Sequence, residues 1–326
     1  MNVKTASLAE IPSDRAKPSA SFNGRRRRFN VDRVFKGVLI GFSSLIVAVL
    51  LAIFLEMIRS SSLSLRTFGL AFLWGRTWDP NPAKEVYGAL PFIYGTVVTS
   101  LIAITLAVPV ALGVALFLTE WAGYRLRTFV SFLVELLAAI PSVIYGLWGI
   151  FVMIPFLRNH VYPALSKTLG FLPIFKGDFY GVSLLSAGMI LSIMILPTIA
   201  SISKEVFLAV PGEMREAVLA LGGTRWESIR LAVLKMSRSG IIGAVFLGLG
   251  RALGETMAVT MVIGNKPEIS TSVFASGYSL AAVIANEFTE ATSPLHLSAL
   301  TEMGLILLGV TFVVNGIARL MVRRPA

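Results

Sequence analysis

The chain has 326 residues, of which 55% are hydrophobic and 14% charged, and its mean hydropathy is +0.78. This balance excludes an ordinary soluble domain and is typical of an integral membrane protein. The absence of cysteine excludes disulfides, thiolate metal sites and cysteine nucleophiles. The net charge is +11, and the position of the basic residues must therefore be explained in a way that fits a membrane protein.

Residues 1–36 form a basic tail that supplies much of this charge. Residues 1–24 contain few large apolar groups, a composition typical of disorder, and we expect the whole tail 1–36 to be disordered on the cytoplasmic side. Arg25 to Arg28 directly precede the first apolar segment, as expected of a run that sets membrane orientation and contacts anionic lipids, so no nucleic acid is needed to explain them. The first apolar segment has full spanning length, and we expect it to be a retained anchor.

Six apolar segments of spanning length follow along the chain. They are residues 37–58, 92–119, 129–157, 182–203, 240–264 and 298–320. An even number of spans places both termini on one side. If that side is the cytoplasm, its segments hold twenty of the 29 lysines and arginines and the outer segments hold eight, an asymmetry that places both termini inside. We therefore predict an all-α membrane protein with six transmembrane helices.

Prolines interrupt three of these segments, at Pro109, Pro141 and Pro197. Broken helices often line cavities, although proline is also frequent in spanning helices generally. Pro141 and Ser142 are therefore candidate residues of a substrate path. Glu120 lies at the end of the second segment, where we expect a solvated carboxylate.

The outer segments 60–87 and 158–180 are long enough to receive an extracytoplasmic binding protein. Their aromatic residues fit either interfacial anchors or contact residues. Two histidines, His160 and His296, each stand alone near an outer segment, and the chain contains no G-x-S-x-G elbow. We therefore expect neither a metal site nor a hydrolase triad.

Residues 204–239 are the longest polar stretch between the later spans, and we name them the hairpin. Pro211 suits a first helical turn, and apolar residues around and after it recur at helical spacing. These are Val210, Met214, Ala217, Val218 and Leu221. Gly222 and Gly223 can supply a left-handed stop, so the first helix is predicted to end there.

A second helix is predicted to follow in the hairpin. Thr224 and Glu227 have the spacing of a capping box. Trp226, Ile229 and Val233 give this helix an apolar face. Two short helices joined by a glycine turn either lie among the lipid headgroups or dock into a partner protein.

The fifth segment carries two charges, Arg251 and Glu255, one helical turn apart. On a continuous helix they share a face and can form an ion pair. An arginine at the middle of a span costs about 2.5–3.5 kcal/mol on insertion scales, so it usually faces a protein interior or a water-filled path. Gly250 and Gly254 form a G-x-x-x-G face that allows a second helix to approach. We predict a transport path here, with an ion pair that only stabilises packing as the alternative.

The hairpin resembles a known motif. Its run E-A-V-L-A-L-G from Glu216 to Gly222 is similar to the E-A-A…G loop of ABC importer permeases, whose short helix inserts into a groove on a separate ATPase subunit. The resemblance implies a coupling helix at about residues 211–222. The implied ATPase coupling residues are Glu216, Ala217, Gly222, Thr224 and Trp226.

Two positions depart from that motif. Val218 stands where the pattern usually has alanine, and Lys235 stands where the family has a proline before the next span. The kink that this proline makes is therefore expected to be missing or made in another way.

Three further stretches narrow the resemblance to the PstC-type permease subunits of bacterial phosphate importers. Residues 250–259 are similar to their R-A-L-G-E-T-M-A segment, residues 137–146 to their I-P-S-V-x-Y-G run, and residues 94–100 to the G-T-x-x-T-S opening of the permease core. The similarity extends from about residue 36 to the end. It implies a type I ABC importer permease fold over residues 37–326, in the bacterial inner membrane.

The resemblance also implies a function and partners. Arg251 would meet phosphate as a bidentate cation while Glu255 holds it in place. The implied partners are a PstA-like second permease subunit, a dimer of a PstB-like ATPase and a PstS-like phosphate-binding protein. No lysine follows a glycine anywhere, so the phosphate-binding loop of ATPases is absent, and we expect ATP to be used by the partner and no cofactor to be bound by this chain.

Other functions remain as alternatives. A permease of the same architecture for sulfate or molybdate would differ only in cargo. A self-contained secondary transporter would show inverted repeats with paired broken helices, which we do not find. A membrane-embedded enzyme is disfavoured because no pairing of a nucleophile with a base is evident.

Overall fold

The computed structural model describes residues 25–81 and 83–323. Across these residues the regular secondary structure is helical, apart from one isolated antiparallel bridge between Asp79 and Val86. The α-helices are α1 (Arg25–Ser60), α2 (Ser62–Phe68), α3 (Ala71–Trp74), α4 (Leu90–Leu116), α5 (Tyr124–Ala139), α6 (Ser142–Trp148), α7 (Ile154–Phe156), α8 (Tyr162–Leu169), α9 (Leu184–Leu208), α10 (Gly212–Ala220), α11 (Arg225–Ser228), α12 (Arg238–Leu253), α13 (Met257–Ile263), α14 (Leu280–Glu287) and α15 (Pro294–Arg323). Short π or 3-10 segments are η1 (Phe117–Trp121), η2 (Gly149–Met153), η3 (Leu157–Val161), η4 (Pro173–Phe175) and η5 (Ile229–Leu234).

Most of the predicted spans are present. Within the described ranges, five helices are long and apolar enough to cross a membrane, and a sixth span arises if one bent helix pair is counted. The predicted segments 37–58, 92–119 and 298–320 lie inside the candidate spans Asp32–Ser60, Leu90–Trp121 and Pro294–Met321, and 182–203 overlaps Leu184–Leu208 in all but its first two residues. The all-α membrane fold class is therefore confirmed.

The third predicted segment, 129–157, is wrong as one continuous helix. α5 ends at Ala139 and α6 begins at Ser142, so the candidate span is Ser142–Leu169. Ile140 has an extended backbone, with φ −66° and ψ 129°. Proline disfavours the helical conformation in the residue before it, and Pro141 therefore ends α5.

The fifth predicted segment, 240–264, is also interrupted. α12 ends at Leu253 and α13 begins at Met257. At the start of α12, the preceding segment Arg225–Leu234 joins it through a bend of 70°. This bend takes the place of the kink that the missing proline would have made.

The chain divides into two units, one ending at Ile53 and the other beginning at Phe54. Residues 1–24 of the predicted disordered tail lie outside the described residues. Residues 25–36 belong to α1, which differs from the expectation of disorder for the whole of 1–36. The helix therefore begins well before the first apolar residue of the predicted span.

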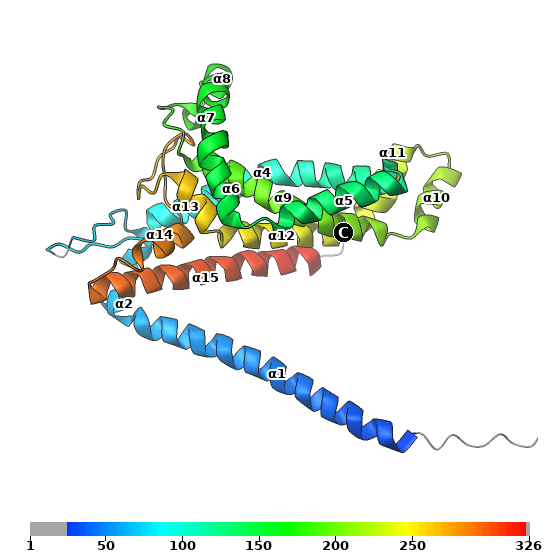
Figure 1. The fold of residues 1–326 in the computed structure, drawn as a ribbon, viewed down its shortest axis with the longest axis horizontal. Helices are drawn as coiled ribbons and strands as arrows, with labels where there is room; N and C mark the ends of the chain where they lie inside the picture. Colours follow the sequence, from blue (N-terminus) through cyan, green and yellow to red (C-terminus); the bar gives the residue numbers. More distant parts are fainter. Residues whose placement is uncertain (1–24, 82, 324–326) are drawn as a thin grey trace, which may run out of the picture. The chain divides into compact units, whose positions relative to one another are not determined.

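The core of the second unit is built around α4 and α9, which lie side by side (Figure 1). Along α4, Ala103, Ala107, Ala111 and Ala115 recur every four residues, and each is at most 1% exposed. Residues at this spacing share one helix face, and their small side chains allow close packing. α9 is buried along most of its length. It is therefore the helix best placed to carry a displacement through the unit.

A second buried cluster lies where α14 and α15 meet the segment before α4. We name Trp78, Tyr87, Phe92, Glu287 and His296 the aromatic cluster. The Trp78 indole N–H donates to Glu287 Oε2 over 2.9 Å, and His296 Nε2 lies 3.1 Å from the same oxygen. The Tyr87 ring stacks on the His296 ring, with centroids 5.3 Å apart. One carboxylate thus joins the segment before α4, 209 residues away, to α14 and the start of α15.

Candidate functional site

Arg251 lies in the last turn of α12 and is half-buried. Its Nη1 donates a hydrogen bond to Thr198 Oγ1 of α9 over 3.3 Å. Among the residues that the structure describes, no carboxylate lies within ion-pair distance of this guanidinium. Because an arginine carries five N–H donors, most of them remain available to a further partner such as an anion.

The predicted pairing of Arg251 with Glu255 is not present, because the helix that would align them ends between them. Gly254 caps α12, and Glu255 lies in the break before α13. Glu255 Oε1 accepts a hydrogen bond from the backbone N–H of Ala258 over 3.2 Å, which satisfies one of the free donors at the start of α13. In the structure Glu255 therefore shapes the break and does not hold Arg251. A glycine followed by two polar residues was the sequence signal for this break.

Within the described residues of this chain, no second helix approaches the predicted G-x-x-x-G face of Gly250 and Gly254. A Cβ atom added at Gly250 would meet nothing, and one at Gly254 would meet only its own helix. α12 instead packs on α9 through Gly240, Ala244 and Gly248, and a Cβ at Gly248 would lie 2.7 Å from Cγ1 of Ile199. The small-residue face thus lies earlier in α12, where it fixes the helix that presents Arg251 against α9.

Pro141 and Ser142 lie at the other interruption, where Pro141 precedes the first residue of α6. Pro141 is exposed and Ser142 is half-buried. α6 packs on α13 so closely that a Cβ at Gly146 would lie 3.2 Å from the Cα of Ala258 and clash with Met261. The two helices that begin after the two breaks therefore contact each other, which places both interruptions in one region of the protein.

The hairpin has the predicted local structure. α10 begins at Gly212, directly after Pro211, and Gly222 adopts the left-handed conformation with φ +84°. Thr224 and Glu227 form the complete capping box of α11, with each side chain accepting from the other residue's backbone N–H. These local signals fix the helix boundaries, and the short helix, the turn and the second helix are confirmed.

The implied coupling residues lie on the hairpin surface. Glu216, Ala217, Gly222 and Thr224 are exposed, and the Trp226 side chain is 58% exposed. Part of the predicted apolar stripe is exposed as well, with Leu221 at 90% and Met214 at 44%, whereas Val210 is buried and Val218 is half-buried. The second helix is different, because Ile229 and Val233 are buried as its predicted apolar face requires. Exposed apolar side chains on a polar element are typical of a surface that a partner covers.

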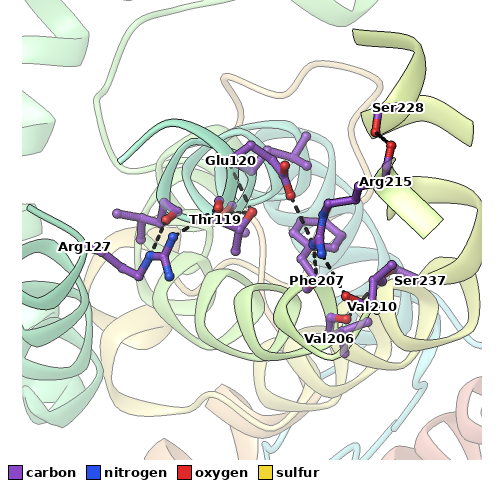
Figure 2. A network of polar contacts seen from close by, with 12 residues as sticks. Thr119, Glu120, Arg127, Val206, Phe207, Val210, Arg215, Ser228 and Ser237 are labelled. Carbon is purple, nitrogen blue, oxygen red and sulfur yellow. Dashed lines mark hydrogen bonds and ion pairs between the residues drawn. The ribbon is translucent and has the colours of Figure 1, made fainter. Parts of the chain in front are cut away.

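Sequence reasoning missed the residue that attaches the hairpin to the spans. Arg215 of α10 forms an ion pair with Glu120 of η1, with Nη2 and Oε1 separated by 3.2 Å (Figure 2). It also donates to the carbonyl oxygens of Phe207 and Val210 at the end of α9, each over 2.8 Å. Glu120 is therefore not the solvated carboxylate we expected. A single basic residue beside the motif gave no signal of a partner 95 residues away.

Neighbouring contacts in Figure 2 extend this attachment. Arg127 of α5 donates to the carbonyl oxygens of Leu118 and Thr119 in η1, over 2.8 and 3.1 Å. The Ser228 hydroxyl donates to the carbonyl oxygen of Arg215 over 3.2 Å, which joins α11 to α10. The ends of α4, α5 and α9 and both helices of the hairpin thus form one polar network.

Comparisons with known proteins agree with this architecture. A family model described as "Binding-protein-dependent transport system inner membrane component" matches residues 107–326. The phosphate transport system permease protein PstC of Mesorhizobium japonicum is 47% identical over 303 residues, which cover 91% of this chain and 92% of the relative. PstC of Pasteurella multocida is 43% identical over 314 residues, which cover 95% of this chain and 97% of that one.

Two solved structures share the fold. A chain of a bacterial alginate ABC transporter, solved with a periplasmic protein carrying an alginate pentasaccharide, matches with a TM-score of 0.58 and 16% identity, and the match covers 91% of this chain and 96% of that chain. A chain of the methionine ABC transporter MetNI in an inward-facing conformation matches with a TM-score of 0.54 and 18% identity, covering 71% of this chain and 93% of that chain. At these identities the likeness shows the fold alone.

Proposed function

We propose the function of this chain from one premise: it belongs to the binding-protein-dependent transport permeases and, within them, to the PstC-type phosphate permeases. It is the transmembrane permease subunit of an ATP-driven phosphate importer and forms half of the path that phosphate takes across the membrane. The observation that carries this assignment is 47% identity to a PstC protein over 91% of the chain.

The path runs beside the two interrupted helices. Arg251 offers its remaining N–H donors to phosphate, which carries one to two negative charges near neutral pH and accepts bidentate hydrogen bonds from a guanidinium. Thr198 orients the guanidinium from α9, and Glu255 keeps the break open by capping α13. Pro141 and Ser142 contribute from the second break.

The hairpin is the docking element for an ATPase. Its exposed apolar side chains, Leu221, Trp226 and Met214, support insertion into a groove on a separate subunit. The exposed coupling residues Glu216, Ala217, Gly222 and Thr224 surround them. A PstA-like permease completes the path, two PstB-like ATPase subunits drive it, and a PstS-like binding protein delivers phosphate from outside.

The same proposal sets the membrane arrangement. The chain lies in the bacterial cytoplasmic membrane with both termini in the cytoplasm, as the distribution of lysine and arginine favours. It binds no cofactor and hydrolyses nothing, and ATP is used by the partner subunit.

Reconstitution tests this function directly. The chain is expressed with its neighbouring transport genes, purified and placed in vesicles with ATP inside and labelled phosphate with its binding protein outside. We expect an ATPase and a second permease to co-purify and phosphate to accumulate. Accumulation of labelled sulfate or molybdate in parallel vesicles, without accumulation of labelled phosphate, would assign the alternative cargo.

Arg251→Gln tests the path within the same assembly. The shorter amide keeps a polar group but removes the charge that attracts an oxyanion, so phosphate uptake should be abolished while the complex still assembles. Arg238→Gln, an exposed arginine at the start of the same helix, is the matched control and should transport normally. Transport at the normal rate by Arg251→Gln would refute the anion role.

A further inference from the structure

Within the hairpin, α10 is attached to the spans mainly through one guanidinium, whereas the second helix packs through Val233 in a buried cluster with Ala115 and Phe207. α10 contains no buried residue, so apolar packing does little to hold it against the spans. Arg215 bridges this gap by contacting three groups on two other elements, Glu120 and the carbonyl oxygens of Phe207 and Val210. Figure 2 shows the Arg215 side chain extending from α10 toward Glu120 in η1 and Phe207 near the end of α9.

The carbonyl contacts place the positive charge at the C-terminal end of α9. The last carbonyls of a helix lack partners within the helix, and the helix dipole favours a cation there. The Arg215 and Glu120 side chains are only 23% and 15% exposed, so their contact is less screened than an ion pair in open solvent. The hairpin is thereby attached to α9 and α4, the pair that forms the core.

α9 also carries the contact to the proposed path. Thr198, which accepts a hydrogen bond from Arg251, lies on the same helix as Phe207, which accepts from Arg215. α9 packs on α4 and α12, and Ile199, Ala200 and Ser203 are buried between these two positions. Such packed helices move as units and do not deform continuously. A displacement of α10 therefore reaches Thr198 through one rigid element.

We propose that Arg215 is the positioning residue that transmits the movement of the docked hairpin to α9 and, through Glu120, to α4. This inference rests on the proposed function and adds the connection between ATP hydrolysis and the path. Without the guanidinium the hairpin would still dock through its exposed apolar surface, but its movement would be absorbed between α10 and α9. ATP hydrolysis would then continue while less phosphate is transported for each ATP.

The test uses the reconstituted full complex and measures phosphate transported per ATP hydrolysed. Arg215→Gln keeps a polar chain but cannot contact both carbonyls and the carboxylate. We expect this variant to assemble and hydrolyse ATP. The amount of phosphate transported per ATP hydrolysed should fall by about tenfold, within the usual range of coupling between sites. Glu120→Gln leaves both carbonyl contacts and should lower the ratio less. Arg230→Gln, an exposed arginine of the same hairpin, should keep the wild-type ratio.

The outcomes separate this inference from the function on which it rests. If the wild-type complex fails to take up phosphate, the proposed function fails. If the wild type couples but Arg215→Gln keeps its ratio, or loses hydrolysis and transport in equal proportion, the transmitting role is refuted. Should Arg215→Gln fail to assemble, Glu120→Gln decides: a reduced ratio supports the role, and an unchanged ratio overturns it.

Discussion

The hairpin and the aromatic cluster each attach a segment outside the spans to the spanning helices, but they do so through different contacts. In the aromatic cluster, Glu287 accepts from Trp78 and contacts His296, and Trp78 and Tyr87 are at most 9% exposed. In the hairpin, Arg215 makes the polar contacts while Leu221 and Trp226 remain exposed.

The two attachments therefore differ in how much movement they allow. Buried rings around a shared acceptor lose stability with any displacement, because packing and hydrogen bonds fail together. An element held by one long side chain can shift while keeping its contacts, and its exposed apolar surface suits a partner. The contacts of the hairpin therefore fit the proposed coupling, and those of the aromatic cluster fit a rigid attachment.

The largest expected effect on stability lies in the aromatic cluster. Glu287→Ala removes the acceptor shared by Trp78 and His296, and a buried group left without a partner costs about 1–3 kcal/mol. The free energy of unfolding should fall by about 2 kcal/mol. Thermal unfolding of the purified chain in detergent measures this loss, with the exposed Glu290→Ala as control. If Glu287→Ala and Glu290→Ala unfold at the same temperature, the aromatic cluster is not the more rigid of the two attachments.

A smaller and local effect is expected at the turn of the hairpin. Gly222 has φ +84°, and a side chain in the left-handed region costs about 1–2 kcal/mol, more so for a β-branched one. Gly222→Val should increase hydrogen exchange at the end of α10 and leave the thermal midpoint of the spans unchanged. Gly222→Asn, which tolerates this conformation, should exchange like the wild type. A lowered global midpoint would show that the hairpin is part of the rigid body.

The smallest effect on folding, and the sharpest on assembly, is expected at Leu221. Its side chain is 90% exposed, so Leu221→Asp should change the free energy of unfolding by less than about 0.5 kcal/mol. Burying the new charge in an apolar groove is unfavourable, and the ATPase should no longer co-purify. Leu221→Met is the matched control. Retention of the ATPase by Leu221→Asp would place the docking surface elsewhere.

Local signals in the sequence were enough for some of these features. The capping box of Thr224 and Glu227 and the left-handed Gly222 depend on backbone interactions within a few residues, and both are present as predicted. The break at Gly254 was missed because hydropathy was averaged across it, so one apolar window concealed two helices. The error at Pro141 has the same origin, although a proline was in view.

The amino-acid sequence by itself determined that the chain is a helical membrane protein, where most spans lie, and which short motifs the hairpin carries. These properties follow from apolar length and from neighbouring residues. Only the tertiary structure decided that Arg251 contacts Thr198 and not Glu255, and that Arg215 joins Glu120 to the end of α9. Such contacts depend on how separate helices pack, and a guanidinium can satisfy its donors in many ways until that packing is fixed.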